Sequence, residues 1–312
     1  MILKTQFAGL EFPNPIGLAA GLDKHAITLQ GMAKVGFGFI EVGTVTPNPQ
    51  PGNPKPRLFT LHEDRAVINR CGFNNDGAER VRERLKRKPG GKIIGINIGA
   101  NSSSADRIND YVRVLSECGP YADYAAINVS SPNTKQLRDL QKGPALVELL
   151  DRISMERDNL EKPIPVFLKI SPDIDYREMV EIAGICRDAA IDGIIATNST
   201  TERNGLKSKF ANEAGGLSGK PLFQHSTRIL ATFYKLTEGK IPLIGVGGIS
   251  CAQHAFEKIR AGASAVQLYT ALTFKGPWIV ESILEGLDDL LAEAGFESVS
   301  DAVGSGYGDW LR

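Results

Sequence analysis

The chain has 312 residues, of which 42% are hydrophobic, and its 36 lysine and arginine residues balance 36 aspartate and glutamate residues. A chain of this length buries a substantial core, while the zero net charge argues against a surface built for nucleic acid or for an anionic membrane. The four cysteines are far apart and form no C-x-x-C pair, so the sequence suggests neither a zinc ribbon nor a disulfide framework.

The sequence also argues against a metal site, a spanning helix and a secretory signal. The four histidines show no metal-ligand spacing, so no metal is expected. No apolar run approaches the roughly 18 residues that a spanning helix needs. The first six residues lack the basic and apolar regions of a signal peptide. We therefore expect reduced thiols and a cytosolic setting.

Short apolar, β-branched runs alternate with longer amphipathic stretches along the chain. The expected strands span residues 15–20, 37–43, 92–98, 122–129, 164–170, 192–197, 242–247 and 264–269. Most are continuous apolar runs, as expected for parallel strands that are covered on both faces. The expected helices span residues 24–35, 76–88, 105–118, 144–159, 176–190, 221–237, 252–261 and 277–294. Proline near several helix starts, with Ser250 and Asp175 as N-caps, supports these boundaries.

Eight strand–helix units in succession predict one α/β domain over residues 1–312, folded as a (β/α)8 TIM barrel. A doubly wound open sheet is the alternative. That fold usually carries a G-x-G-x-x-G turn after its first strand, and residues 19–24 here read AAGLDK. The barrel is therefore the preferred fold.

The connections after strands two, four and six are unusually long. Residues 44–75 contain five prolines and have some strand character around residues 57–61, while residues 199–220 are rich in glycine, lysine and asparagine. Structureless loops longer than about 12–15 residues are usually lids or binding loops. All three loops leave the carboxyl ends of their strands, where barrel enzymes keep their chemistry.

A small or polar residue stands at the carboxyl end of every expected strand. The set is Ala20-Gly21, Gly43-Thr44, Asn97, Asn128, Lys169, Thr197-Asn198, Gly247-Gly248 and Tyr269-Thr270. Chains often leave strands through polar residues, but buried amides need partners, and a bound ring of donors and acceptors would supply them. The pattern predicts a polar ligand site at this end of the barrel.

Residues 245–250, GVGGIS, follow strand seven and open a helix. Bare backbone amides beside the positive end of a helix form a phosphate cradle, and Tyr269-Thr270 after strand eight would complete it. The alternative is that the glycines serve only a tight turn. The loop predicts a phosphorylated ligand without specifying which one.

The heptapeptide NVSSPNT at residues 128–134 follows strand four and combines two amides with three hydroxyls. Its proline keeps the backbone extended and prevents a helix from starting there. Such runs are often ordinary turns. Here the amides could read the rim of a planar polar ring, while a hydroxyl between them reaches a ring hydrogen.

Lys169 ends the apolar fifth strand and has two functional interpretations. It could stabilise negative charge on a reduced cofactor ring, or it could form a Schiff base in an aldolase-like lyase. A third hypothesis is a barrel that binds a phosphorylated metabolite without catalysis. The lyase leaves the many asparagines unexplained.

Taken together, these motifs resemble dihydroorotate dehydrogenase of the membrane-linked, quinone-reducing class 2. The likeness extends from about residue 14 to residue 283. Its segments are GLAAGLDK (17–24), GTVTP (43–47), INRCGFN (68–74), NVSSPNT (128–134), GLSGKP (216–221) and GVGGIS (245–250).

The resemblance implies FMN as the phosphorylated ligand, (S)-dihydroorotate as the substrate and orotate, for pyrimidine synthesis, as the product. By position, the residues expected to hold the cofactor are Ala20, Gly21, Leu22, Asp23, Lys24, Thr44, Asn97, Asn128, Lys169, Thr197, Gly219, Gly248, Tyr269 and Thr270. Those expected to hold the substrate are Lys24, Asn69, Arg70, Cys71, Gly72, Phe73, Asn128, Asn133, Asn198 and Ser199.

The family chemistry removes a proton from C5 of the substrate and a hydride from C6. Ser131 falls on the catalytic base, and Thr134 and Phe73 match positions beside a proton relay. Lys169 would lie near the flavin edge that gains negative charge on reduction. Class 1 enzymes carry cysteine as the base, so Ser131 implies class 2 and a quinone acceptor; a soluble acceptor is the alternative.

Three departures from the family pattern stand out. Class 2 enzymes usually carry an N-terminal extension that docks on the membrane and forms the quinone tunnel, whereas this sequence begins almost directly at the barrel. The resemblance therefore implies a monomer at the cytoplasmic side of the membrane, or a cytoplasmic enzyme if the extension is absent. Ser199 replaces a common threonine, and Lys135-Gln136 replace a small residue and glycine.

Overall fold

The computed structural model describes residues 2–134 and 137–312. Eight parallel strands close into a barrel in the order β10-β12-β13-β3-β4-β7-β8-β9. Their bounds are β3 Ile16–Leu18, β4 Phe39–Val45, β7 Ile93–Ile98, β8 Tyr124–Asn128, β9 Val166–Ile170, β10 Gly193–Ala196, β12 Leu243–Val246 and β13 Ala265–Leu268. Each expected strand is present, so the predicted (β/α)8 barrel is confirmed.

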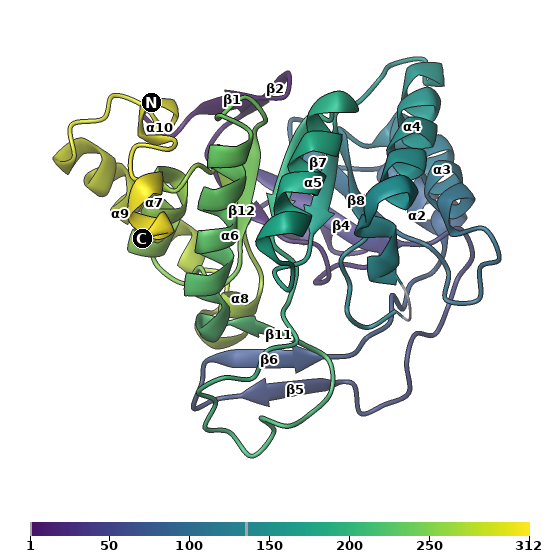
Figure 1. Ribbon diagram of the computed structural model, residues 1–312, viewed down its shortest axis with the longest axis horizontal. Helices are drawn as coiled ribbons and strands as arrows, with labels where there is room; N and C mark the ends of the chain where they lie inside the picture. The colour runs from purple at the N-terminus through teal and green to yellow at the C-terminus, as the bar shows by residue number, and fades with distance from the viewer. Residues whose placement is uncertain (1, 135–136) are drawn as a thin grey trace.

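Helices surround the barrel on its outside (Figure 1). The larger ones are α2 Ala78–Leu85, α3 Arg107–Cys118, α4 Gly143–Asn159, α5 Tyr176–Asp188, α6 Phe223–Leu236, α7 Ala252–Arg260 and α9 Ile279–Glu293. Short helices are α1 Leu29–Met32, α8 Thr270–Lys275 and α10 Val299–Ala302, with 3₁₀ turns η1 Gly119–Tyr121, η2 Leu137–Gln141, η3 Lys220–Leu222 and η4 Tyr307–Leu311. The large helices match the expected ones to within a few residues.

The helix expected over residues 24–35 is wrong, because only α1 forms there. Both carboxylate oxygens of Asp23 accept backbone N–H groups of the following loop, including those of Ile27 at 3.0 Å and Thr28 at 2.8 Å. Ala26 adopts a positive φ of 57°, which no α-helix tolerates. The buried Asp23 carboxylate therefore accepts hydrogen bonds from backbone N–H groups that would otherwise donate within a helix.

Of the two expected helix caps, one is confirmed and one is wrong. Asp175 caps α5 and forms a full capping box with Glu178. Ser250 does not cap α7, because the N-cap residue is Cys251. The Ser250 backbone N–H instead faces Nδ1 of His254 at 3.3 Å.

A β-hairpin that the sequence analysis did not predict closes the amino end of the barrel. Strands β1 Thr5–Phe7 and β2 Leu10–Phe12 pair antiparallel. Phe12 stacks on Phe7 with ring centroids 4.4 Å apart and contacts Phe39 of β4 edge-on at 5.1 Å. The hairpin thus extends the aromatic core that fills the lower barrel, which also contains Tyr124 and Phe167.

The two longest connections meet in a three-stranded sheet. Strands β5 Leu58–Leu61 and β6 Ala66–Asn69 come from the loop after β4, and β11 Gly216–Gly219 comes from the loop after β10. All neighbours are antiparallel, with β6 in the middle. This sheet lies at the opposite end of the molecule from the β1–β2 hairpin (Figure 1), so it covers the carboxyl ends of the barrel strands.

Among the residues that the structure describes, no helix combines the length and the apolar character needed to cross a bilayer. Within the same residues, no group of three or more histidine, cysteine, aspartate or glutamate side chains is arranged to hold a metal ion. The sequence departure at Lys135-Gln136 lies outside the described residues.

Candidate active site

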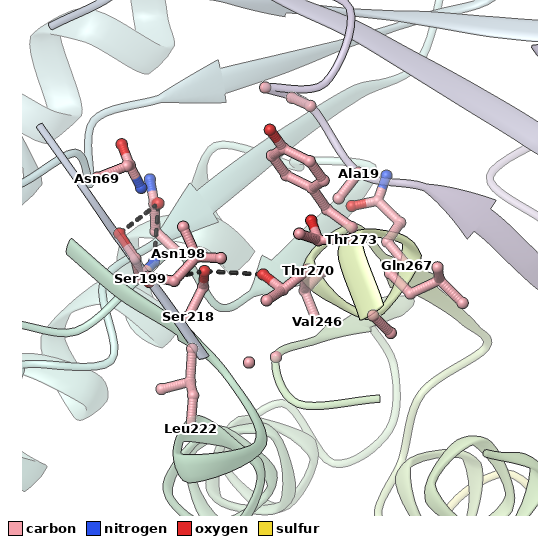
Figure 2. A pocket seen from close by; sticks show the side chains of 18 of the residues that line it. Ala19, Asn69, Asn198, Ser199, Ser218, Leu222, Val246, Gln267, Thr270 and Thr273 are labelled. Carbon is pink, nitrogen blue, oxygen red and sulfur yellow. Dashed lines mark hydrogen bonds between the residues drawn. The ribbon is translucent and has the colours of Figure 1, made fainter. Parts of the chain in front are cut away.

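A cavity lies between the carboxyl ends of the barrel strands and the three-stranded sheet (Figure 2). It gathers most of the residues expected at a site, although they come from the ends of seven barrel strands and from three long loops. The expected residues that line it are Ala20, Gly21, Lys24, Thr44, Asn69, Cys71, Gly72, Phe73, Asn128, Ser131, Asn133, Lys169, Thr197, Asn198, Ser199, Gly219, Gly248, Tyr269 and Thr270.

The inner wall of the cavity contains three side-chain amides linked by hydrogen bonds, those of Asn97, Asn128 and Asn198, which we call the amide wall. Asn128, at the end of β8, donates from Nδ2 to Thr44 Oγ1 at 2.9 Å and to Asn97 Oδ1 at 3.0 Å. Its own Oδ1 accepts from Asn198 Nδ2 at 3.2 Å and from the Ser130 hydroxyl at 3.1 Å. Each buried amide is oriented by its neighbour, so the wall presents a preorganised pattern of donors and acceptors.

The Ser131 loop faces this wall. Ser131 is 5% exposed, and its Oγ accepts the Asn133 backbone N–H at 3.2 Å. The Asn133 side chain donates to Asn69 Oδ1 at 3.1 Å, which ties the loop to β6 of the covering sheet. The hydroxyl and two amides therefore surround one part of the cavity.

Thr134 lies next to this group but not in the cavity lining. Its hydroxyl is buried, and among the residues that the structure describes it has no hydrogen-bond partner. Buried hydroxyls are normally satisfied, so this one is suited to exchange a proton with a neighbour or with ordered water.

Four lysines and Arg65 line the cavity, and two of the lysines, Lys24 and Lys169, are expected site residues. Lys24 donates to the Gly21 carbonyl oxygen, and burial lowers the pKa of its ammonium. Lys169, at the end of β9, is 5% exposed and lies 3.7 Å from the Glu41 carboxylate under the amide wall. The Lys24 ammonium can attract an anionic ligand, because a charge in a partly desolvated site acts more strongly than one in water. The charge of Lys169 is opposed by the Glu41 carboxylate.

The opposite part of the cavity is a glycine cradle. Gly247 and Gly248 have positive φ values of 113° and 77°, and a Cβ on Gly248 would lie 2.5 Å from Phe223. Thr270, at the start of α8, donates to the Ser218 hydroxyl of β11 at 2.8 Å (Figure 2). Bare amides and hydroxyls at this edge suit a phosphate group.

Some expected site residues lie outside the cavity lining. Asp23 organises the loop after β3, as described above, and Leu22 beside it packs against the hydrophobic core. Arg70 points away to pair with Glu213 at 2.7 Å and stacks over Phe59. Asn97 lies one layer deeper, where it holds Asn128.

Several lining residues were not predicted from the sequence. Gln267 of β13 and Ser218 of β11 face the cavity, as Figure 2 shows. Others belong to the β5–β6 hairpin (Leu58, Thr60, Arg65 and Val67), to η3 (Lys220 and Leu222) and to α8 (Thr273, Phe274 and Lys275). The strand character around residues 57–61 was a signal for the sheet, but only its pairing with β11 places it over the barrel.

Comparison with known proteins agrees with this geometry. The sequence model of the family described as "Dihydroorotate dehydrogenase" matches residues 2–291. A protein of Cereibacter sphaeroides named "Dihydroorotate dehydrogenase (quinone)" is 55% identical over 310 residues, which cover 99% of this chain and 88% of that protein. The chain belongs to the dihydroorotate dehydrogenase family.

Other relatives agree with this assignment. "Dihydroorotate dehydrogenase (quinone), mitochondrial" of Mus musculus is 49% identical over 314 residues, covering 97% of this chain and 80% of that protein. The ligand-free crystal structure of DHODH from Eimeria tenella superposes with a TM-score of 0.94 at 40% identity, covering 97% of this chain and 91% of its own. The complex of that protein with ferulenol also gives 0.94, at 39% identity and 97% and 88% coverage.

These names confirm the predicted membership in the quinone class 2. The family uses a flavin, so the chain is a flavin-dependent oxidoreductase. The Schiff-base lyase and the non-catalytic binding barrel, which the sequence alone left open, are therefore wrong.

Proposed function

We propose that this chain oxidises (S)-dihydroorotate to orotate in pyrimidine synthesis, with FMN as cofactor, Ser131 as general base and a quinone as electron acceptor. The observation that carries the proposal is the convergence of Ser131, the amide wall and two lysines on one cavity. The family membership supports the reaction, and the cavity supplies side chains for each of its parts.

The residues at the cavity fit an FMN group. The glycine cradle with Thr270 would take the phosphate, while Asn128, Thr44 and Lys169 would face the isoalloxazine ring. Gln267 lines the cavity, and its Oε1 is buried without a hydrogen-bond partner among the described residues, as expected of an acceptor reserved for a ligand. When bound, FMN supplies the hydride acceptor.

The substrate has a carboxylate and several amide edges. Lys24 would bind the carboxylate, and Asn69, Asn133, Asn198 and Ser199 would bind the amide edges, because asparagine both donates and accepts hydrogen bonds without adding charge. Cys71, Gly72 and Phe73 complete the walls. Binding from both the barrel and the covering sheet holds the ring in one orientation and excludes water.

Ser131 would take the proton from C5 of the substrate. A serine hydroxyl is a weak base, so its own proton has to pass onward as it accepts the new one. Thr134, whose buried hydroxyl has no hydrogen-bond partner among the described residues, is suited to the next position, and the buried Phe73 would border that path.

The electron acceptor and the setting of the enzyme form a second part of the proposal. We infer a quinone acceptor, a peripheral position at the cytoplasmic face of the membrane, and a monomeric enzyme with one FMN-binding domain. The names of the relatives support the quinone, and a quinone dissolved in a bilayer requires the enzyme to reach the membrane. Turnover that proceeds with fumarate but not with a short-chain quinone would contradict this inference.

The central test is Ser131→Ala in the FMN-loaded protein. We expect the variant to stay yellow but to lose most of its turnover, by about 10²–10⁴-fold, the usual contribution of a general base. The measurement is the rate at which dihydroorotate bleaches the flavin in stopped flow. A near-normal rate would contradict the role of Ser131.

Ser131→Cys is the matched control. It should retain part of the activity, because a thiolate can serve the same step. Its rate should rise with pH as the thiol ionises. A Cys variant as inactive as the Ala variant would indicate that the position needs its shape, not a proton acceptor.

A further inference from the structure

A buried carboxylate without a role in the mechanism above lies directly under the amide wall. Glu41 stands in the middle of β4 and is fully buried. Its Oε1 accepts from Asn97 Nδ2 at 2.8 Å. Its Oε2 accepts from Gln267 Nε2 at 2.8 Å and from the Tyr124 hydroxyl at 3.1 Å. Burying a charge is unfavourable unless it is paired and hydrogen-bonded, so this convergence is a built site.

The carboxylate determines how the amides above it are oriented. A carboxylate only accepts hydrogen bonds, so Asn97 has to present its NH₂ group downward to Glu41. The Asn97 carbonyl then faces upward, where it accepts from Thr44 Oγ1 at 2.5 Å and from Asn128 Nδ2 at 3.0 Å. The orientation of Asn128, which faces the cavity, therefore follows from the charge two layers below.

The same carboxylate is the charge partner of Lys169. The Lys169 Nζ lies 3.7 Å from Glu41 Oε1, and both side chains are almost completely buried. A lysine on this floor attracts negative charge from the cavity, whereas the carboxylate beside it opposes that effect. The Lys169 ammonium and the Glu41 carboxylate together therefore contribute a net charge close to zero below the cofactor.

We propose that Glu41 is a positioning residue that holds the Lys169 ammonium and the amide wall in place, and that its negative charge lowers the reduction potential of the bound flavin. This inference rests on the proposed function, because it takes the cofactor on the wall to be FMN. Neither Glu41 nor Tyr124 lines the cavity, so their effects on the cofactor are indirect.

The test is the flavin midpoint potential of the FMN-loaded Glu41→Gln variant, measured by dye-equilibrated spectroscopic titration. Removing a negative charge below the ring stabilises the reduced flavin. We expect the reduction equilibrium to shift at least tenfold toward the reduced form, which is about 30 mV for a two-electron couple. A glutamine also offers an NH₂ group to a site built from donors, so FMN should dissociate more readily.

Tyr124→Phe is the matched control. It removes a neighbouring hydrogen bond to the same carboxylate but leaves both charges in place. We expect its potential to stay within twofold of the wild-type equilibrium. A Tyr124→Phe shift as large as that of Glu41→Gln, or an unshifted Glu41→Gln, would overturn the inference.

Glu41→Gln leaves the buried Lys169 without its carboxylate partner, so a second pair of variants tests the Glu41 charge without that unpaired lysine. Lys169→Met and the double variant Glu41→Gln, Lys169→Met differ only at residue 41, where an amide replaces the carboxylate. We expect the double variant to have the more positive potential. Equal potentials for the two proteins would overturn the inference.

The wild-type protein separates the two proposals. If dihydroorotate does not bleach its flavin, the proposed function fails. If dihydroorotate does bleach it and the Glu41 charge leaves the potential unchanged, only the present inference fails.

Discussion

Among the single residues at the carboxyl end of the barrel, some polar side chains face the cavity and others stabilise the surrounding loops. Asn128 and Ser131 face the cavity, whereas Asp23 uses its carboxylate to fold the loop after β3. Arg70 follows Asn69 directly in the sequence, yet it leaves the cavity for an ion pair with Glu213. Side chains of neighbouring residues in a strand point to opposite faces of the sheet. A sequence motif at a binding site therefore also contains residues that do not face the ligand.

Lys24 is the cation that we expect to bind the substrate carboxylate. Lys24→Met should raise KM for dihydroorotate and lower kcat/KM by roughly 10–100-fold, because a charge-assisted hydrogen bond contributes about 1.5–3 kcal/mol. Steady-state kinetics with a saturating acceptor measure this loss. Lys207→Met, an exposed lysine on the same side of the molecule, should leave KM unchanged.

The pH dependence of the wild type follows from the same residue. Burial lowers the pKa of Lys24 from its ordinary value, and the substrate carboxylate binds the protonated form. Affinity for dihydroorotate should therefore fall as the pH rises through the lowered pKa. A KM for the wild type that follows the same pH profile as that of Lys24→Met would contradict this assignment.

At the scale of elements, the packing of α7 on α6 contains a buried lysine. Lys258 of α7 has no exposed surface, and its Nζ donates to Ser226 Oγ at 2.9 Å and to Thr227 Oγ1 at 3.0 Å, both on α6. Ser226 in turn donates to the Gly247 carbonyl at 3.2 Å. This contact joins the two helices directly behind the glycine cradle.

Burial lowers the pKa of Lys258 from 10.5 to about 7. Between these two values the unfolded chain binds one more proton than the folded protein, so this contribution to stability rises with pH. The contribution of Lys258 to stability is fully present above the pKa of the unfolded chain. It is lost as the pH falls through the lowered pKa of the folded protein. The slope is at most about 1.4 kcal/mol per pH unit.

We therefore expect Lys258→Met to change how stability depends on pH. The free energy of unfolding of the wild type, relative to the variant, should increase from pH 7 to pH 10, as urea unfolding at several pH values would measure. Methionine fills a similar volume, and Ser226 and Thr227 keep acceptors on the Phe223 and Gly247 carbonyls. Parallel pH curves for the two proteins would contradict the prediction.

At the scale of the whole molecule, the two ends of the barrel serve separate purposes. The β1–β2 hairpin and the aromatic core close one end, while the three-stranded sheet covers the cavity at the other (Figure 1). Inside the lower barrel, aromatic rings fit over glycines of neighbouring strands. A Cβ on Gly95 would lie 2.0 Å from the Tyr124 ring, and one on Gly193 would lie 2.5 Å from Phe167. Stability and chemistry therefore depend on different residues.

Phe12→Ala tests this separation. The side chain is fully buried, and its loss should lower the free energy of unfolding by about 3–5 kcal/mol, the usual cost of such a cavity. KM for dihydroorotate should not change in the folded fraction. Phe12→Leu should cause a smaller loss by the same unfolding measurement. An altered KM in either variant would show that the two ends are coupled.

The eight strands, most of the helices and the polar residues at the strand ends were predictable from the amino-acid sequence alone. These features depend on local patterns: apolar runs mark strands that are buried on both faces, and the chain leaves each strand through a characteristic residue. The serine heptapeptide and the glycine loop were recognisable for the same reason. Asp175 and its capping box are also local, since both partners lie within four residues.

The floor and the cover of the site depend on contacts between distant parts of the chain, which the sequence pattern did not reveal. A strand buried on both faces has no apolar–polar alternation to show which residues point inward, so Glu41 and Gln267 were not recognisable as neighbours before barrel closure brought β4 and β13 together. The pairing of β6 with β11 joins segments about 150 residues apart, which no local pattern encodes. The helix expected after β3 does not form, because the buried Asp23 carboxylate accepts hydrogen bonds from the same backbone N–H groups.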